Sequence, residues 1–181
     1  MDDAGALGRR VIVTGTAGAG KSTFSRALSV RTGLPVIVLD LHFWQPGWVE
    51  PSDDAWRATQ RSLLAGDAWI ADGNYHDTLE LRLERAETVV FLDTPRWLCA
   101  TRALIRGVRN RPAGFELPEG CAESRGLRFR AEWRLAGLIL QNHRADRARE
   151  LAIVSEHGRH TTLHVLRSKR EVRAFLERVR Q

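Results

Sequence analysis

Short apolar runs alternate along the chain with segments in which apolar residues recur every three or four positions. The apolar runs are rich in β-branched residues and are bounded by glycine, proline or charged residues, which is typical of buried parallel strands. They lie at 9–14, 35–40, 68–73, 88–93 and 161–166. The spacing of apolar residues between the runs predicts helices at 21–33, 51–66, 76–86, 95–109, 127–142 and 169–179.

This alternation of strands and helices predicts an α/β fold, a parallel sheet with helices on both faces. A chain of 181 residues is the size of one domain, so we expect a single domain over 1–181 with its core over 9–181. An irregular segment rich in proline and glycine separates two helices at 110–126. Loops of this length inside a compact domain are often lids, and we expect one at about 107–126.

The sequence GTAGAGKS at 15–22 fits the pattern G-x-x-x-x-G-K-[ST], and it lies between a predicted strand and a predicted helix. Glycines let the backbone wrap around phosphate oxygens, and the start of the helix adds N–H donors and partial positive charge. A glycine-rich turn followed by chance by Lys-Ser is the alternative. The pattern predicts ATP bound by Gly15, Thr16, Ala17, Gly18, Ala19, Gly20, Lys21, Ser22 and Thr23, with Lys21 reaching the β- and γ-phosphates.

Aspartates end three of the predicted strands, at the sheet edge where open parallel sheets bind their ligands. Asp72 resembles a Walker B carboxylate and is expected to hold Mg²⁺ together with the hydroxyl of Ser22. Asp40 is placed to activate or hold an acceptor hydroxyl. Capping of the loops is the alternative for both, and Asp93, which precedes Thr-Pro and a helix, is expected to cap that helix.

Arginines and tryptophans supply the remaining candidates. Arg102 and Arg106 lie one turn apart on the helix that leads into the expected lid, where they would stabilise the charge on a transferred phosphoryl group, unless they form a solvated helix face. Trp44 and Trp48 lie in an expected acceptor-binding insertion at about 41–66. They would stack on a flat acceptor such as a base, or else form a hydrophobic plug. The predicted catalytic residues are thus Lys21, Asp40, Arg102 and Arg106.

The net charge of +6 comes almost entirely from arginine and has two interpretations. The charge favours polyanion binding, or it is spread over solvated helix faces, since no dense basic run occurs. One hypothesis is an ATP-dependent kinase that acts on a nucleotide-like or other hydroxyl or phosphate acceptor. A second is a nucleotide-responsive regulator that binds DNA, although no helix-turn-helix or aromatic RNA-binding signature is visible. A third is an NTPase without an acceptor.

The sequence also bears on compartment and assembly. No apolar stretch of about 20 residues predicts a membrane span, and 1–8 is expected to be a loose tail and no signal peptide. Cys99 and Cys121 lie in different segments, as expected for reduced thiols in the cytoplasm. The sequence leaves open whether the protein is a monomer or a homodimer.

Six motifs together resemble one group of proteins. They are GTAGAGKS at 15–22, LDLHFWQPGW at 39–48, DGNY at 72–75, FLDTPRWLCATRALIR at 91–106, GCAE at 120–123 and VLRSKREVRAFL at 165–176. The chain resembles the adenylate-kinase-like P-loop kinases of the nucleoside monophosphate kinase and shikimate kinase group. Within that group it is most similar to the bacterial DNA topology modulation protein family.

The resemblance implies strand order 2-3-1-4-5, ATP and Mg²⁺, an acceptor-binding insertion after the second strand and a lid after the helix that ends near Arg109. It implies that Arg102 and Arg106 are the lid-helix arginines and that the loop 167–169, with Lys169, lies near the adenine. Adenylate kinases carry D-G-F-P-R after the third strand, and that arginine grips AMP. This chain has DGNYH at 72–76, with no arginine there. The acceptor is expected between Asp40 and the turn formed by Gly73, Asn74 and Tyr75.

Overall fold

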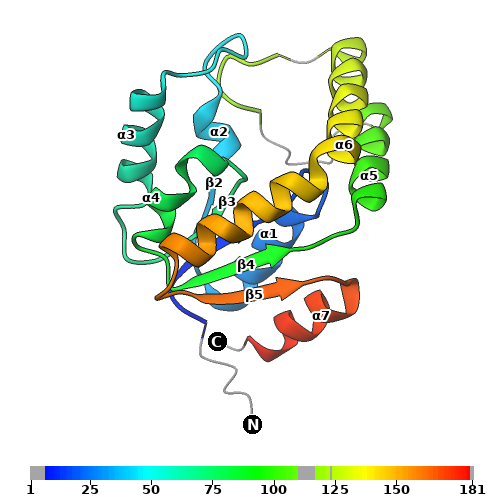
Figure 1. The fold of residues 1–181 in the computed structure, drawn as a ribbon. Helices are drawn as coiled ribbons and strands as arrows, with labels where there is room; N and C mark the ends of the chain where they lie inside the picture. The colour runs from blue at the N-terminus through cyan, green and yellow to red at the C-terminus, as the bar shows by residue number, and fades with distance from the viewer. Residues whose placement is uncertain (1–6, 110–116, 123, 180–181) are drawn as a thin grey trace.

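A five-stranded parallel sheet forms the centre of the molecule (Figure 1). The computed structural model describes residues 7–109, 117–122 and 124–179, so most of the expected tail and the middle of the expected lid lie outside the described residues. The strands are β1 (Arg10–Thr14), β2 (Val36–Val38), β3 (Trp69–Asp72), β4 (Thr88–Leu92) and β5 (Thr162–Leu166). Their order, β2-β3-β1-β4-β5, confirms the predicted α/β fold and strand order.

Helices connect the strands and cover both faces of the sheet. They are α1 (Lys21–Thr32), α2 (Leu39–Phe43), α3 (Asp53–Leu63), the 3₁₀ turn η1 (His76–Thr78), α4 (Leu79–Leu83), α5 (Arg96–Val108), α6 (Arg125–His157) and α7 (Lys169–Arg178). Alternate residues of β1 belong to two different apolar clusters. Val11 and Val13 pack with residues of α1, α5, α6 and α7, whereas Ile12 packs with residues of α4 and the far end of α6. The two-sided burial explains why the central strands β1, β3 and β4 are largely apolar.

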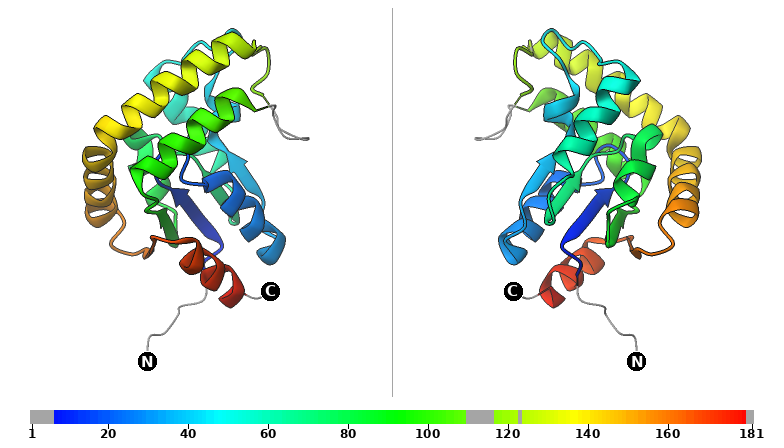
Figure 2. Two further views of the ribbon diagram at one scale, coloured as in Figure 1. Left: turned by 90° about the vertical axis from the view of Figure 1, so that its right-hand side faces the viewer. Right: turned by 90° about the vertical axis from the view of Figure 1, so that its left-hand side faces the viewer.

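Helix α6 is much longer than the prediction of 127–142, which was wrong at its C-terminal end. The N-terminal part of α6 runs beside α5, and the C-terminal part crosses the sheet (Figures 1 and 2). Ser124 caps the helix by accepting a hydrogen bond from Leu127 N at 3.3 Å. The second half is mostly polar, but Glu150 and Val154, one turn apart, are both buried. Tertiary contacts of a largely polar segment therefore extend the helix.

Two more local predictions need correction. The second strand was expected to continue to residue 40, but β2 ends at Val38 and Asp40 lies in the short helix α2. The chain turns there because Leu39 is completely buried beneath Gly73, whose ideal Cβ would lie 2.8 Å from Leu39 Cβ. The helix expected at 76–86 is instead a 3₁₀ turn followed by the single helical turn of α4.

Candidate active site

The loop between β1 and α1 has the conformation that its glycines allow. Gly15 has φ 129° and Gly18 has φ 81°, values that side chains with a Cβ rarely adopt. A Cβ on Gly15 would lie 2.6 Å from the carbonyl oxygen of Leu92, and a Cβ on Gly18 would lie 2.4 Å from that of Cys99. Helix α1 then begins at Lys21 with no side-chain cap, so the N–H groups of its first turn stay available for an anion.

Lys21 lies folded over this phosphate loop. Its Nζ donates hydrogen bonds to the carbonyl oxygens of Gly15 at 2.7 Å and Thr16 at 3.3 Å. Burial lowers the pKa of Lys21 below its ordinary value, while the charges of Asp72, Asp40 and Glu150 oppose that shift. The single ammonium group is thus held inside the loop, with carboxylates nearby.

Asp72 lies beside the loop at the end of β3, paired in register with Val13 of β1 and Val38 of β2. It is 3% exposed, and burial raises the pKa of its carboxyl group, while Lys21 and the hydroxyl of Ser22 counteract the shift. Its Oδ2 accepts no hydrogen bond from any described residue. A buried, unsatisfied carboxylate oxygen beside a hydroxyl fits Mg²⁺, which is bound in proteins by one or two carboxylates and keeps several waters.

The two arginines predicted on α5 have different surroundings. Arg102 lies against the phosphate loop, and its Nη1 donates hydrogen bonds of 3.0 Å to the carbonyl oxygens of Gly18 and Ala19. Arg106 is directed toward α6, where its Nη2 lies 2.6 Å from Oε2 of the buried Glu132. The structure therefore brings Arg102 to the loop and pairs Arg106 with α6.

Asp93 does not cap α5, so that prediction was wrong. The cap residue of α5 is Pro95, and no side chain caps the helix. The carboxylate of Asp93 instead accepts two hydrogen bonds of 2.9 Å from Arg147 of α6. The guanidinium of Arg167 also lies 3.7 Å from it, which connects the β4 end to the loop 167–169. Lys169 is the exposed first residue of α7 in that region.

The predicted acceptor residues converge on Tyr75. Its hydroxyl donates a 2.7 Å hydrogen bond to Asp40 Oδ1, and its ring centroid lies 4.6 Å from that of Phe43. Trp44 lies 5.0 Å from Phe43, and Trp48 lies 5.7 Å from Trp44, between ring centroids. The aromatic residues therefore form one wall that extends outward from Asp40.

The outer end of this wall lies against the segment that precedes α6. Trp48 Nε1 donates a 2.9 Å hydrogen bond to the carbonyl oxygen of Ala122, and Gly47 N donates one of 3.1 Å to Gly120. The thiol of Cys121, which is buried, donates to Gln45 O at 3.2 Å. Residues 117–122 and the turn of the insertion are thus hydrogen-bonded neighbours.

Beneath the turn Gly73–Asn74–Tyr75 lies a buried polar network that the sequence analysis missed. Arg82 is fully buried and donates hydrogen bonds to the carbonyl oxygens of Gly73 at 2.8 Å and Tyr75 at 2.7 Å. Burial lowers the pKa of Arg82 to about 10. An arginine among the leucines of LELRL is the one sequence signal that would have indicated this role.

Glu150 of α6 completes the network and was also missed. It is 1% exposed, accepts a hydrogen bond from Thr14 Oγ1 and lies 3.3 Å from His76 Nε2. Asn74 Oδ1 lies 3.3 Å from the same Thr14 Oγ1. Glu150 therefore joins the end of β1, directly before the loop 15–20, to His76, which follows the turn Gly73–Asn74–Tyr75.

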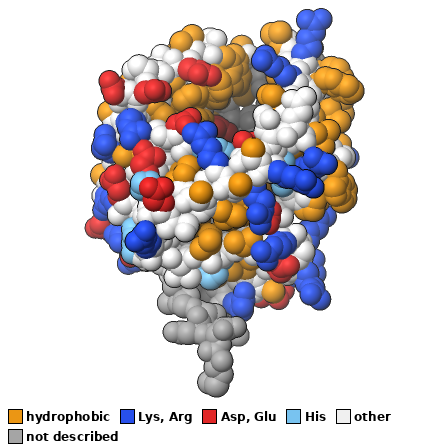
Figure 3. All heavy atoms as spheres, viewed as in Figure 1, with side chains coloured by type: hydrophobic (Ala, Val, Ile, Leu, Met, Phe, Trp, Pro, Cys, Tyr) orange, Lys and Arg blue, Asp and Glu red, His pale blue; other side chains and the backbone are white. Residues whose placement is uncertain are grey.

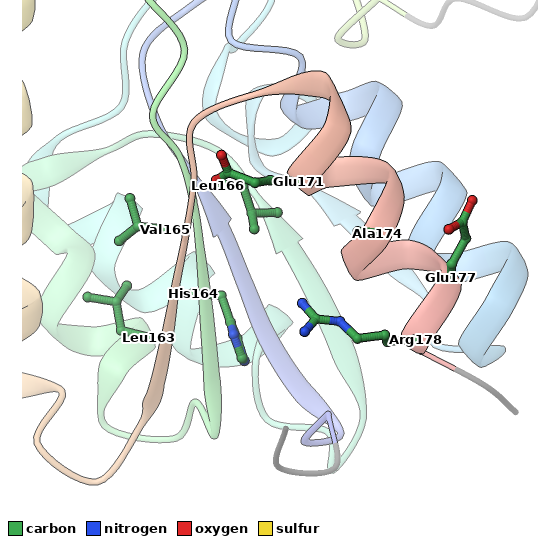
Figure 4. Close-up of a pocket in the computed structure, with 8 residues that line it drawn as sticks. All are labelled: Leu163, His164, Val165, Leu166, Glu171, Ala174, Glu177 and Arg178. Carbon is green, nitrogen blue, oxygen red and sulfur yellow. The ribbon is translucent and has the colours of Figure 1, made fainter. Parts of the chain in front are cut away.

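Another groove lies away from the residues described above. A groove of about 870 Å³ lies between β5 and α7, where His164 and Leu166 face Arg178 and Glu171 (Figure 4), and none of its lining residues belongs to the phosphate loop or the acceptor wall. On the face in Figure 3, lysine and arginine side chains are interspersed with aspartate and glutamate. Among the described residues, no helix combines the length and apolar character needed to cross a membrane.

Comparisons with known proteins establish the fold. No protein-family profile matches the sequence, and no curated protein matches it significantly. Among solved structures, shikimate kinase from Bacteroides thetaiotaomicron is 18% identical with a TM-score of 0.51, covering 94% of this chain and 95% of its own. Gluconokinase from Sinorhizobium meliloti 1021 is 18% identical with a TM-score of 0.51, and the match covers 97% of this chain and 95% of the gluconokinase. Shikimate kinase from Acinetobacter baumannii, in complex with shikimate, is 15% identical with a TM-score of 0.51, covering 95% and 90%.

At these identities the similarity concerns the fold alone. The five-stranded parallel sheet and the match to a shikimate kinase and a gluconokinase over nearly the whole chain confirm the predicted α/β fold. The finer resemblances to adenylate kinases and to DNA topology modulation proteins stay predictions. The chain has the α/β fold of these shikimate kinases and this gluconokinase.

Proposed function

We propose that the protein is an ATP-dependent phosphotransferase that acts on a small-molecule acceptor. The observation that carries the proposal is the unsatisfied Oδ2 of Asp72, buried beside Ser22 and Lys21 at the start of a helix with no side-chain cap. The hydroxyl of Ser22 hydrogen-bonds the carboxyl group, but Oδ2 stays unpaired, whereas most buried polar atoms in folded proteins have a partner. An unpaired oxygen here suits a site that is completed by a nucleotide and its metal ion.

The residues divide the chemistry among them. Lys21 exchanges its loop carbonyls for the β- and γ-phosphates of ATP, and Arg102 adds positive charge at the same loop. When bound, Mg²⁺ would be held by Ser22 and, through water, by Asp72, and it would neutralise charge on the phosphates. The loop 167–169, with Lys169, is proposed for the adenine side.

Asp40 is the proposed base or clamp for the acceptor. Tyr75 donates to Oδ1 of Asp40, and Oδ2 has no hydrogen bond from a described residue, so it can accept one from an acceptor hydroxyl. Asp40 also lies within electrostatic range of Lys21 and Asp72, so the acceptor hydroxyl would lie beside the phosphate loop. Trp44, Trp48, Gly73, Asn74 and Tyr75 are proposed to line the rest of the acceptor site.

The test is Mg²⁺-dependent release of ADP from ATP, with and without a panel of nucleosides, nucleoside monophosphates, sugars and hydroxy acids. One acceptor class is expected to stimulate release, and Lys21→Ala and Asp40→Ala are each expected to abolish the stimulation. Full turnover in both variants would refute the assignment. Tight ATP binding without stimulation by any acceptor would instead favour the nucleotide-responsive regulator, which then requires DNA binding with a steep salt dependence.

A further inference from the structure

The acceptor wall offers aromatic faces beside a carboxylate. Phe43 and Trp44 are half-buried, Trp48 is 37% exposed, and the buried Trp56 supports Phe43 and Tyr75 from behind. Trp44 and Trp48 meet edge to face, so the edge of one ring covers part of one face of the other, and this contact leaves their remaining faces uncovered. Such a wall suits a ring with a flat, carbon-rich face, and Asp40 at its inner end suits a hydroxyl group.

Charges of both signs act on this wall, and most of them are negative. Burial raises the pKa of the Tyr75 hydroxyl well above its ordinary value, the charges of Asp40 and Glu50 raise it further, and the charge of the buried Arg82 opposes them. Tyr75 is therefore a neutral donor within electrostatic range of two carboxylates, with Arg82 beneath the turn. A phosphate or carboxylate on the acceptor would meet like charge here, which is costly in a desolvated site.

Two guanidinium groups next to the wall, those of Arg82 and Arg57, already bind other groups of the protein. Arg82, under the acceptor turn, is fully buried, and its Nη1 and Nη2 both donate to turn carbonyls. Arg57 on α3 pairs with Glu80 at 2.6 Å. Arg26 on α1 is the candidate cation for an anionic acceptor group. It is exposed, its charge lowers the pKa of Asp72, and no described carboxylate pairs with it.

We propose that the acceptor is an uncharged, ring-shaped hydroxyl compound, of the sugar or nucleoside class, that stacks on Trp44 and Trp48 while Asp40 accepts from its hydroxyl. This inference rests on the proposed phosphotransferase function and narrows its acceptor. Selectivity arises from the acidic wall, which rejects anionic analogues more than it attracts the neutral ones.

Matched pairs of acceptors that differ by one anionic group test the inference. Glucose is compared with glucose 6-phosphate and glucuronate, and adenosine with AMP, by ADP release at fixed ATP and Mg²⁺. We expect kcat/KM to be about 30-fold or more higher for the uncharged member of the pair that is used. Turnover with glucose would identify a sugar kinase, and turnover with adenosine would identify a nucleoside kinase.

Two variants test the stated cause. Glu50→Lys is expected to lower the ratio of kcat/KM for the uncharged acceptor to that for the anionic one about tenfold, because one carboxylate near the wall becomes a cation. The KM for ATP should change little. Trp48→Phe keeps a stacking face and is expected to retain the ratio, whereas Trp48→Ser is expected to raise the acceptor KM about tenfold.

The outcomes separate this inference from the proposed function. A preference for the anionic member of each pair refutes the inference and leaves the phosphotransferase standing, and loss of that preference in Arg26→Ala would identify the responsible cation. Absence of Lys21-dependent turnover with every member of every pair refutes both. An unchanged ratio in Glu50→Lys refutes the charge argument itself.

Discussion

Gly18 of the phosphate loop gives the sharpest structural test of the site. The change is Gly18→Ala, which adds one methyl group where φ is 81° and where the nearest atom, the carbonyl oxygen of Cys99, would lie 2.4 Å away. Gly33→Ala is the matched control, because its φ is 70° but no atom lies within 4 Å of the added Cβ. Both variants carry the same backbone strain, and only one carries a clash.

The expected magnitudes follow from this difference. Left-handed backbone costs a residue with a Cβ about 1–2 kcal/mol, so Gly33→Ala should lower the free energy of unfolding by about that amount. Gly18→Ala adds overpacking against backbone, which costs about 1–3 kcal/mol more and cannot be relieved by a rotamer change. The loop must shift away from α5 instead, and this moves the N–H groups that are proposed to bind phosphate.

Urea unfolding measures the free energy of unfolding of each variant. Isothermal titration calorimetry with ATP and Mg²⁺ measures the affinity for ATP. Gly18→Ala should be the less stable variant and should weaken ATP binding about tenfold or more, while Gly33→Ala should leave ATP binding unchanged. Equal losses of stability in the two variants, together with wild-type ATP affinity in Gly18→Ala, would refute the argument that this close approach shapes a nucleotide site.

Three further predictions concern buried charge. Asp72→Asn should abolish Mg²⁺-dependent ADP release yet raise the urea midpoint at pH 7: burial raises the pKa of Asp72, so above that pKa the folded protein contains an ionised carboxyl group whose burial is unfavourable. Glu150→Gln should raise the acceptor KM about tenfold more than the ATP KM in initial-rate assays, since Glu150 contacts Thr14 and His76; equal rises would contradict a positioning role. Arg106→Ala should lower the free energy of unfolding by about 2 kcal/mol, because Glu132 is left buried without its partner, and Arg106→Ala/Glu132→Ala should recover part of that loss; a large fall in kcat without loss of stability would instead assign Arg106 to catalysis.

Local signals explain what the sequence predicted well. The phosphate loop is contiguous, so the residues from Gly15 to Ser22 and the strand and helix around them can be read together. The buried strands are apolar throughout, so their number and type were clear, and Ser52 caps α3 as expected, by accepting from Ala55 N at 3.3 Å. The strand and helix around the loop 15–22, and the cap of α3, were therefore predicted correctly.

Roles that depend on distant partners were not visible. Arg106 was grouped with Arg102 because both lie on one side of α5, but its partner Glu132 lies 26 positions away, in the next helix. Asp93 was assigned to the nearest helix, whereas its partner Arg147 is 54 positions away. Nothing in local periodicity selects between a near and a distant partner, since both satisfy the same carboxylate.

Helix α6 shows why periodicity itself failed in one place. Glu132 and Glu150 are 18 residues apart, which is five turns at 3.6 residues per turn, so they lie on one face of the helix. Ala136, Ile139 and Val154 are buried with them. The inward face is therefore a mixture of small apolar residues and paired carboxylates, and an analysis that follows only apolar residues loses it after residue 142. The carboxylates that obscure the pattern are the ones that join α6 to α5 at one end and to the phosphate loop and acceptor turn at the other.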